Sequence, residues 1–200
     1  MNQYNLGYTT GALLSEHFDT VVHHSKDFSL LTTGQESIDH SIITVNSESS
    51  QKKYLSEILK RLNGFHVPVL EFYKRADEKS KKVIQFYAVC HSYQIILEFM
   101  IDVVRNKWLH LDFELERYDY KSYLQDKLLE ANQADHATEN TLKKLTQIFF
   151  RMIRELGMYS GKQFRKIHVD DRLMKIITDC GDNWFLDVML LSDNEKNNIC

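Results

Sequence analysis

The chain is poor in the residues that interrupt helices. Among its 200 residues there is one proline, Pro68, and there are seven glycines. Chains built from many short strands need frequent glycine and proline turns, so this scarcity argues against an all-β protein. Apolar residues make up 43% of the chain, which is ordinary for a globular protein with a sizeable core. The composition therefore predicts an all-α fold, a globular bundle of helices.

Cysteine is also scarce. The three cysteines, Cys90, Cys180 and Cys200, are widely spaced and form no CxxC pair. An odd number at this spacing excludes a disulfide framework, and a reducing cytoplasm is the expected compartment. The N-terminus lacks the basic region and apolar core of a secretory signal.

A long uncharged apolar run is absent as well. The most apolar stretch, VIQFYAVCHSYQIILEFMIDVV, contains Glu98 and Asp102. A membrane-spanning helix needs about 20 mostly apolar residues with few charges. We therefore expect this stretch to be a buried core helix, and we expect no contact with a membrane.

Sequence motifs of enzymes are missing. The chain contains no GxGxxG, GxxxxGK[ST], HExxH or GxSxG. The nine histidines do not follow metal-ligand spacing: His17 and His24 lie one heptad apart, but no cysteine or carboxylate completes a ligand set with them. We expect a protein that is not an enzyme and that has no cofactor, no metal site and no small-molecule substrate.

Hydrophobic periodicity and capping residues place the helices. Helices are predicted over residues 35–44, 50–62, 78–106 and 118–131 and from residue 141 onward. A short β-hairpin is predicted within 157–169, with Gly161 in its turn, and the polar tail after Ser192 is expected to fray. We expect a helical subdomain with a helix-turn-helix at 1–76 and, at 77–200, a long central helix followed by a winged-helix-like part. One compact unit is the alternative.

Positive charge is concentrated near the C-terminal end. Between Thr141 and His168 there are seven basic residues and one glutamate, a net charge of +6 in a chain of −3. A basic helix followed by a basic hairpin is what a winged helix-turn-helix presents to a phosphate backbone. The other interpretation is an ordinary solvated helix face.

A second basic segment lies nearer the N-terminus. Residues 51–82 hold nine basic and four acidic side chains, and the helix predicted over 50–62 follows another helix and a serine-rich turn. This outline is typical of a helix-turn-helix, although an ordinary antiparallel helix pair fits it equally. Basic side chains here are expected to contact phosphates, which gives affinity and little sequence choice. The candidate DNA contacts of the two segments are Lys52, Lys53, Lys60, Arg61, Thr141, Lys143, Lys144, Gln147, Arg151, Arg154, Lys162, Arg165 and Lys166.

Three stretches carry a family resemblance: TTGALLSE, AVCHSYQIILEFMIDVVRNKWLHLD and TLKKLTQIFFRMIRELGMYS. With the serine-rich cap and the helix that ends in KRL, they resemble the BrxA family, small proteins of bacteriophage-exclusion (BREX) defence systems. The resemblance extends over most of residues 6–180, and none of its motifs is catalytic. It implies an all-helical fold related to the NusB-like RNA-binding fold, helix-turn-helix elements flanked by positive charge, and binding to double-stranded DNA.

The resemblance also implies partners, namely other BREX components such as an ATPase and a DNA methyltransferase. The function expected from the sequence is therefore that of a non-enzymatic, cytoplasmic component of phage defence that binds double-stranded DNA. Two alternatives stay open. One is a protein–protein adaptor within the defence complex, whose basic faces meet an acidic partner. The other is an RNA-binding protein of the NusB-like type, for which fold analogy is the argument.

Overall fold

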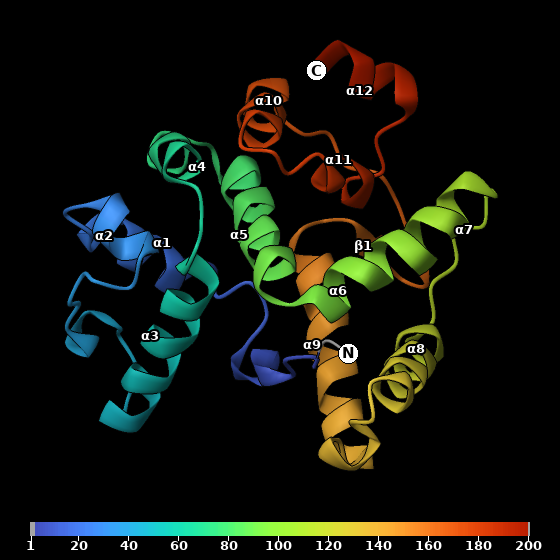
Figure 1. Cartoon of the computed structure of the whole chain (residues 1–200), viewed down its shortest axis with the longest axis horizontal. Helices are drawn as coiled ribbons and strands as arrows, with labels where there is room; N and C mark the ends of the chain where they lie inside the picture. The colour runs from blue at the N-terminus through green and yellow to red at the C-terminus, as the bar shows by residue number, and fades with distance from the viewer. Residues whose placement is uncertain (1–2, 200) are drawn as a thin grey trace. The chain divides into compact units, whose positions relative to one another are not determined.

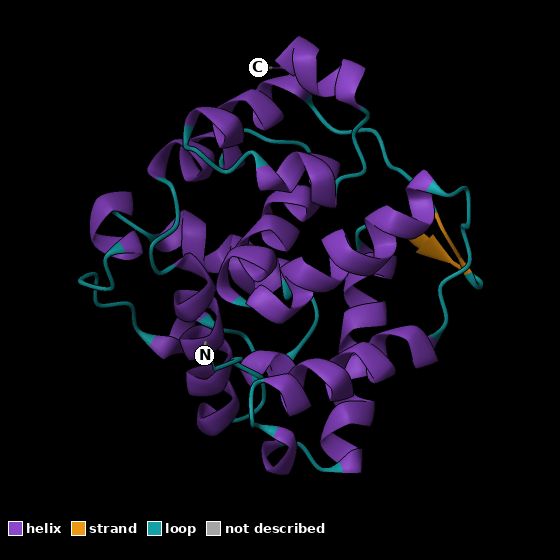
Figure 2. Cartoon of the chain, turned by 45° about the vertical axis from the view of Figure 1, so that its right-hand side comes forward, coloured by secondary structure: helices purple, strands orange, loops and turns teal. Residues whose placement is uncertain are grey.

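The computed structural model describes residues 3–199, and helices account for most of them (Figures 1 and 2). Within this part of the chain, strand structure is confined to one small pairing, drawn in orange in Figure 2. The predicted all-α class is confirmed.

The chain forms two compact units, each assembled from separate stretches of sequence. The first unit comprises the chain up to Ala12, Tyr93–His168 and the chain from Asn183 onward. The second unit comprises Leu13–Ser92 and Val169–Asp182. The boundary expected after Ala76 lies inside the second unit, because the helix that follows it packs against the earlier helices of that unit.

Several helices of the second unit begin where a short polar side chain accepts a hydrogen bond from the first turn. Ser47 accepts from the Ser50 amide, Asp77 accepts from the Ser80 amide, and Asp170 starts the last helix in the same way. The six helices are α1 (Ser15–His24), α2 (Phe28–Thr32), α3 (Glu48–Leu62), α4 (Val67–Tyr73), α5 (Glu78–Ser92) and α10 (Asp171–Asp179).

Helix α5 is buried on every side along its second half. All eight positions of Val83–Cys90 are buried, as the nearly all-round apolar pattern predicts. One of them, Gln85, is polar, and its amide is satisfied because it accepts a hydrogen bond from Ser15 and donates one to the Tyr73 hydroxyl.

Two of the predicted helices are wrong. Residues 35–44 contain only a 3₁₀ turn, His40–Ile42, where the Asp39 carboxylate accepts a hydrogen bond from the Ser41 amide. Such local bonding competes with helix formation. The helix predicted over 78–106 is interrupted at Tyr93, whose φ of −129° and ψ of 85° are not helical. This backbone conformation accompanies burial of the Tyr93 ring, which lies edge-on to Tyr8 at 5.2 Å.

The interruption limits the length of the apolar helices. Among the described residues, no single helix is long and apolar enough to cross a membrane. Glu78–Ser92 and Gln94–Leu109 reach the required length and composition only when taken together across the break.

The first unit contains the remaining elements. Its N-terminal stretch contains a 3₁₀ helix at Gly7–Thr10. Its next stretch begins with α6 (Gln94–Phe99), a π-helical turn at Met100–Arg105 and α7 (Asn106–Leu109). The polar tail after Ser192, for which fraying is predicted, forms a helix over Asp193–Ile199. The other elements are α8 (Arg117–Glu130), α9 (Glu139–Glu155), β1 (Tyr159–Ser160), β2 (Gln163–Phe164), α11 (Trp184–Val188) and α12 (Asp193–Ile199).

Aromatic side chains fix α9 against its neighbours. The Phe149 ring stacks on Tyr120 of α8 at 4.1 Å between centroids and meets Phe99 of α6 edge-on at 5.1 Å. The Tyr120 hydroxyl shares a buried hydrogen bond of 2.7 Å with the Tyr8 hydroxyl. Because these rings are large and buried, they determine which face of α9 points inward.

The hairpin pairs with a third short segment. Strands β1 and β2 are antiparallel, with Gly161 in the turn at a φ of 65°, so the predicted hairpin is confirmed. An antiparallel bridge joins Glu114 to Gln163, and the Phe164 amide donates to the Phe113 carbonyl at 2.9 Å. Across this pairing the order is residues 113–115, β2, β1. In sequence, α8 and α9 lie between residues 113–115 and the hairpin.

Candidate functional site

Helix α9, the helix of the C-terminal basic segment, is strongly amphipathic. Thr138 caps it by accepting a hydrogen bond from the Thr141 amide. Its inward stripe repeats every three or four residues, the spacing of one helix face. That stripe consists of Leu142, Leu145, Phe149, Phe150, Met152 and Ile153, all buried.

The outward stripe of α9 is basic. The exposed positions continue from one turn to the next, and they carry two lysines near the start of the helix and two arginines near its end. Within the described residues neither Lys143 nor Lys144 forms an ion pair. The exposed face consists of Lys143, Lys144, Gln147, Arg151 and Arg154, and we call it the α9 basic face.

The two arginines of the α9 basic face have weak intramolecular partners. Arg151 pairs with Glu155 at 2.7 Å, one turn along the helix, and the guanidinium of Arg154 lies over the Tyr159 ring at 5.8 Å. Exposed pairs one turn apart are worth about 0.3–0.5 kcal/mol, so an arriving phosphate can replace the carboxylate. Thr141, also predicted as a contact, is half-buried, and its hydroxyl is engaged with that of Thr138 at 3.0 Å.

The basic residues of the hairpin lie beside acidic ones. Lys162 in the turn pairs with Glu116 at 3.0 Å, a bond that raises the pKa of Lys162. Lys166 pairs with Glu195 of α12, and the Arg165 guanidinium donates to the Gly157 carbonyl at 3.2 Å. The acidic run at 112–116 thus lies next to the hairpin and offsets its charge, which leaves α9 as the more positive surface of the segment.

Helix α3 holds four other predicted contacts, and the structure separates them. Lys52, Lys53 and Lys60 are exposed, with Lys52 paired to Glu48 at 2.5 Å. Arg61 is fully buried and contacts Glu57 at 2.7 Å, and it also donates to the Leu13 carbonyl at 3.3 Å. The prediction that Arg61 faces outward is therefore wrong, because Arg61 and Glu57 form a buried ion pair inside the second unit.

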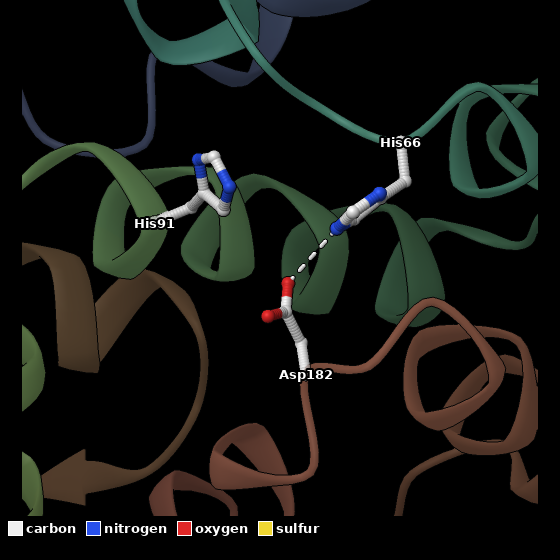
Figure 3. A group of neighbouring side chains, drawn as sticks. All are labelled: His66, His91 and Asp182. Atoms are coloured by element: carbon white, nitrogen blue, oxygen red, sulfur yellow. Dashed lines mark hydrogen bonds and ion pairs between the residues drawn. The ribbon is translucent and has the colours of Figure 1, made fainter.

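The second unit also brings together three potential metal ligands. His66 precedes α4, His91 lies in the last turn of α5, and Asp182 follows α10 (Figure 3). One ligand atom from each residue lies within 4.8 Å of the other two. His66 Nε2 is 3.0 Å from Asp182 Oδ2, and all three side chains are partly exposed. We call these residues the His–His–Asp cluster.

Aromatic neighbours hold the His–His–Asp cluster. The Tyr87 hydroxyl donates to the same Asp182 oxygen. Burial, and to a smaller extent this hydrogen bond, raise the pKa of Tyr87. The Phe65 ring lies edge-on to His91 at 6.0 Å. Burial lowers the pKa of His91, against the opposing effect of Asp182, and the neighbouring His66 lowers it further.

Sequence spacing did not indicate this cluster. The three residues belong to separate segments of the chain, and neither histidine has a ligand partner one helical turn away. The expectation that no metal ligands come together rested on local spacing, and local spacing does not detect residues that are distant in sequence and meet only in the folded chain.

Known proteins resemble this chain in sequence and in fold. The model of one protein family, BrxA, matches residues 2–179. The BREX protein BrxA of Bacillus cereus is 24% identical over 171 residues, which cover 83% of this chain and 85% of that protein. The crystal structure of an uncharacterized protein from Magnetospirillum magneticum superposes with a TM-score of 0.77 at 15% identity, covering 96% of this chain and 100% of that one, a likeness of fold alone.

Proposed function

We propose, because this chain belongs to the BrxA family, that it is a component of a BREX phage-defence system and acts there as a non-enzymatic protein that binds double-stranded DNA. The α9 basic face is the surface that we assign to the DNA. Its partners would then be duplex DNA and other BREX components, such as the methyltransferase or the ATPase.

The connectivity of the first unit supports this proposal. A helical segment, α6 to α7, is followed by the extended residues 113–115, then α8, α9 and the hairpin, which pairs back onto 113–115. This is the order of elements in a winged helix-turn-helix, in which the second helix of the motif enters the major groove. In this arrangement α8 is the supporting helix and α9 is the recognition helix.

The single observation that carries the proposal is the division of α9 into two faces. The aromatic contacts of Phe149 hold one face inward, so Lys143, Lys144, Arg151 and Arg154 point outward together with Gln147. Four cations along one helix face match the phosphates that flank a groove, and a glutamine amide among them can bond to a base edge. The hairpin adds less than its sequence suggests, because Lys162 and Lys166 have carboxylate partners.

The test is a fluorescence-anisotropy titration of labelled duplex DNA at several salt concentrations. Log affinity should fall with log salt at a slope of about −0.9 per phosphate contact. Replacing Lys143 and Lys144 together by alanine should weaken binding to all duplexes alike and make the slope shallower by up to about two units. The melting temperature should barely change, because exposed charges contribute within about 0.5 kcal/mol to folding.

A matched control removes two lysines elsewhere. Lys26→Ala with Lys175→Ala, two exposed lysines outside both basic segments, takes away the same net charge and should leave affinity and slope near the parental values. If the Lys143/Lys144 variant binds like the parent, the α9 basic face is not the DNA surface. Lys52→Ala with Lys53→Ala on α3 then tests the second basic segment directly.

Two further outcomes identify the alternatives. Failure of the parent to bind any duplex at low salt, with binding to an acidic BREX component that depends on the same lysines, would favour the adaptor function. Structured RNA that displaces duplex DNA at much lower concentration than unlabelled duplex does would favour RNA as the ligand. The adaptor follows from the same basic face, and RNA from fold analogy.

A further inference from the structure

We propose that the His–His–Asp cluster is a binding site for one divalent transition-metal ion of the zinc class. The ligands are one imidazole nitrogen each from His66 and His91 and the carboxylate of Asp182 (Figure 3). The site lies wholly inside the second unit, whereas α9 belongs to the first, and the proposal does not rest on the proposed binding of DNA.

The donor set determines the class of ion. Two imidazoles and one carboxylate suit zinc and its first-row neighbours, whereas calcium and magnesium prefer sites made of oxygen alone. The imidazole nitrogens bind the ion in their neutral form, so binding should weaken as the pH falls and the rings are protonated. The Asp182 carboxylate supplies the anionic ligand beside the two imidazoles.

The distances require only a small adjustment. Tetrahedral zinc with ligand bonds of about 2.0–2.1 Å places its ligand atoms roughly 3.3 Å apart. The contact between His66 and Asp182 is 3.0 Å, so it must open by a few tenths of an ångström. The widest separation in the cluster is under 4.8 Å, so it must close by about 1.5 Å at most, which side-chain rotation can supply because the rings are only half-buried.

The surroundings resemble the outer partners of known metal sites. A ligating carboxylate is commonly oriented by a further hydrogen bond, and here the Tyr87 hydroxyl donates to Asp182. Three protein ligands leave a fourth tetrahedral position for water. Tyr87 is therefore a positioning residue, which acts on the metal through Asp182.

A bound ion would join three segments of the second unit. It would connect the α3–α4 loop, the end of α5 and the residue after α10. The second unit consists of two stretches of sequence, Leu13–Ser92 and Val169–Asp182. His91 is the next-to-last residue of the first stretch, and Asp182 is the last residue of the second. Binding should therefore stabilise the folded second unit, because an ion that binds only the folded chain shifts the unfolding equilibrium.

The experiment uses the full chain after treatment with EDTA and removal of the chelator. Zinc titrated by calorimetry should bind with one equivalent per chain, and the melting temperature should rise by several degrees. Cobalt(II) in place of zinc should produce the visible absorption of a tetrahedral site with nitrogen and oxygen ligands. Absence of both the thermal shift and the cobalt spectrum in the parent chain would overturn the proposal, and this outcome needs no variant to fold.

Variants then locate the ion. His66→Gln, His91→Gln and Asp182→Asn keep the size of the side chain, and each should weaken zinc binding at least tenfold. Tyr87→Phe should weaken it about tenfold through the orientation of Asp182. The control is His24→Gln, an exposed histidine of the same unit, which should bind zinc like the parent. If zinc binds equally well to the control and to the three ligand variants, the ion occupies another place and the assignment fails.

Discussion

Replacement of Arg61 by alanine is the sharpest test of the second unit, because sequence and structure assign opposite roles to this residue. The basic pattern of residues 51–82 predicts an outward side chain that contacts DNA. In the structure Arg61 is 0% exposed and Glu57 is 5% exposed, with their charged atoms 2.7 Å apart. The substitution should therefore damage the fold and leave the chemistry of DNA binding intact.

The magnitude follows from what remains after the substitution. Glu57 would be a buried carboxylate without its guanidinium, and the Leu13 carbonyl would lose a donor. Breaking a buried ion pair by removing one partner costs about 3–5 kcal/mol, and the lost packing of the arginine stem adds to this. For a chain of this size, each kcal/mol shifts the melting temperature by roughly 2–4 °C, so the expected loss is on the order of 10 °C.

Thermal unfolding followed by circular dichroism measures this loss, and Lys53→Ala on the exposed face of the same helix is the control, with an expected change within about 0.5 kcal/mol. Combining Arg61→Met with Glu57→Leu should recover most of the lost stability, because apolar residues of similar volume replace a buried pair at little cost. If the Arg61→Ala variant has the same melting temperature as the parent but a shallower salt dependence of DNA binding, the burial argument is refuted and Arg61 is a surface contact.

Three further predictions concern the first unit. Phe149→Ala should lower the free energy of unfolding by about 3–5 kcal/mol in a urea titration, because it removes the ring stacked on Tyr120; a loss under 1 kcal/mol would contradict the packing. Gly161→Ala should cost about 1 kcal/mol and speed amide hydrogen exchange in the hairpin, because φ is 65° although an added Cβ meets no atom within 4 Å; unchanged exchange would argue against this turn. A hydrogen bond from the Lys166 ammonium, with smaller contributions from Ser192, lowers the pKa of Glu195 from its ordinary 4.5 to about 2. The contact therefore stabilises the fold above pH 4.5, and that contribution is lost as the pH falls towards 2. An NMR titration should show this low pKa, and Lys166→Met should return it towards 4.5; a Glu195 pKa that stays the same in the variant would exclude the pair.

Local chemistry made much of the fold predictable. The caps at Thr138 and Asp170, Pro68 in the first turn of α4 and the hairpin around Gly161 each depend on residues within a few positions of one another. The two faces of α9 follow from a repeat of 3.6 residues, which fixes which side chains point the same way. For these features the sequence is sufficient, because the interactions that determine them are short in sequence.

Long-range contacts decided the rest. The pair of Glu57 and Arg61 is visible in the sequence as a spacing of one turn, but only packing removes it from water. The pairing of Lys162 with Glu116 offsets a charge that the sequence counts in full. His66, His91 and Asp182 lie in different segments, and only the fold brings them within 4.8 Å. By itself the sequence determined most of the helices, several of their caps and the two faces of α9, because those depend on neighbours along the chain. The tertiary structure alone decided which charges remain in water and which distant side chains meet, because both depend on surfaces that form when the helices pack.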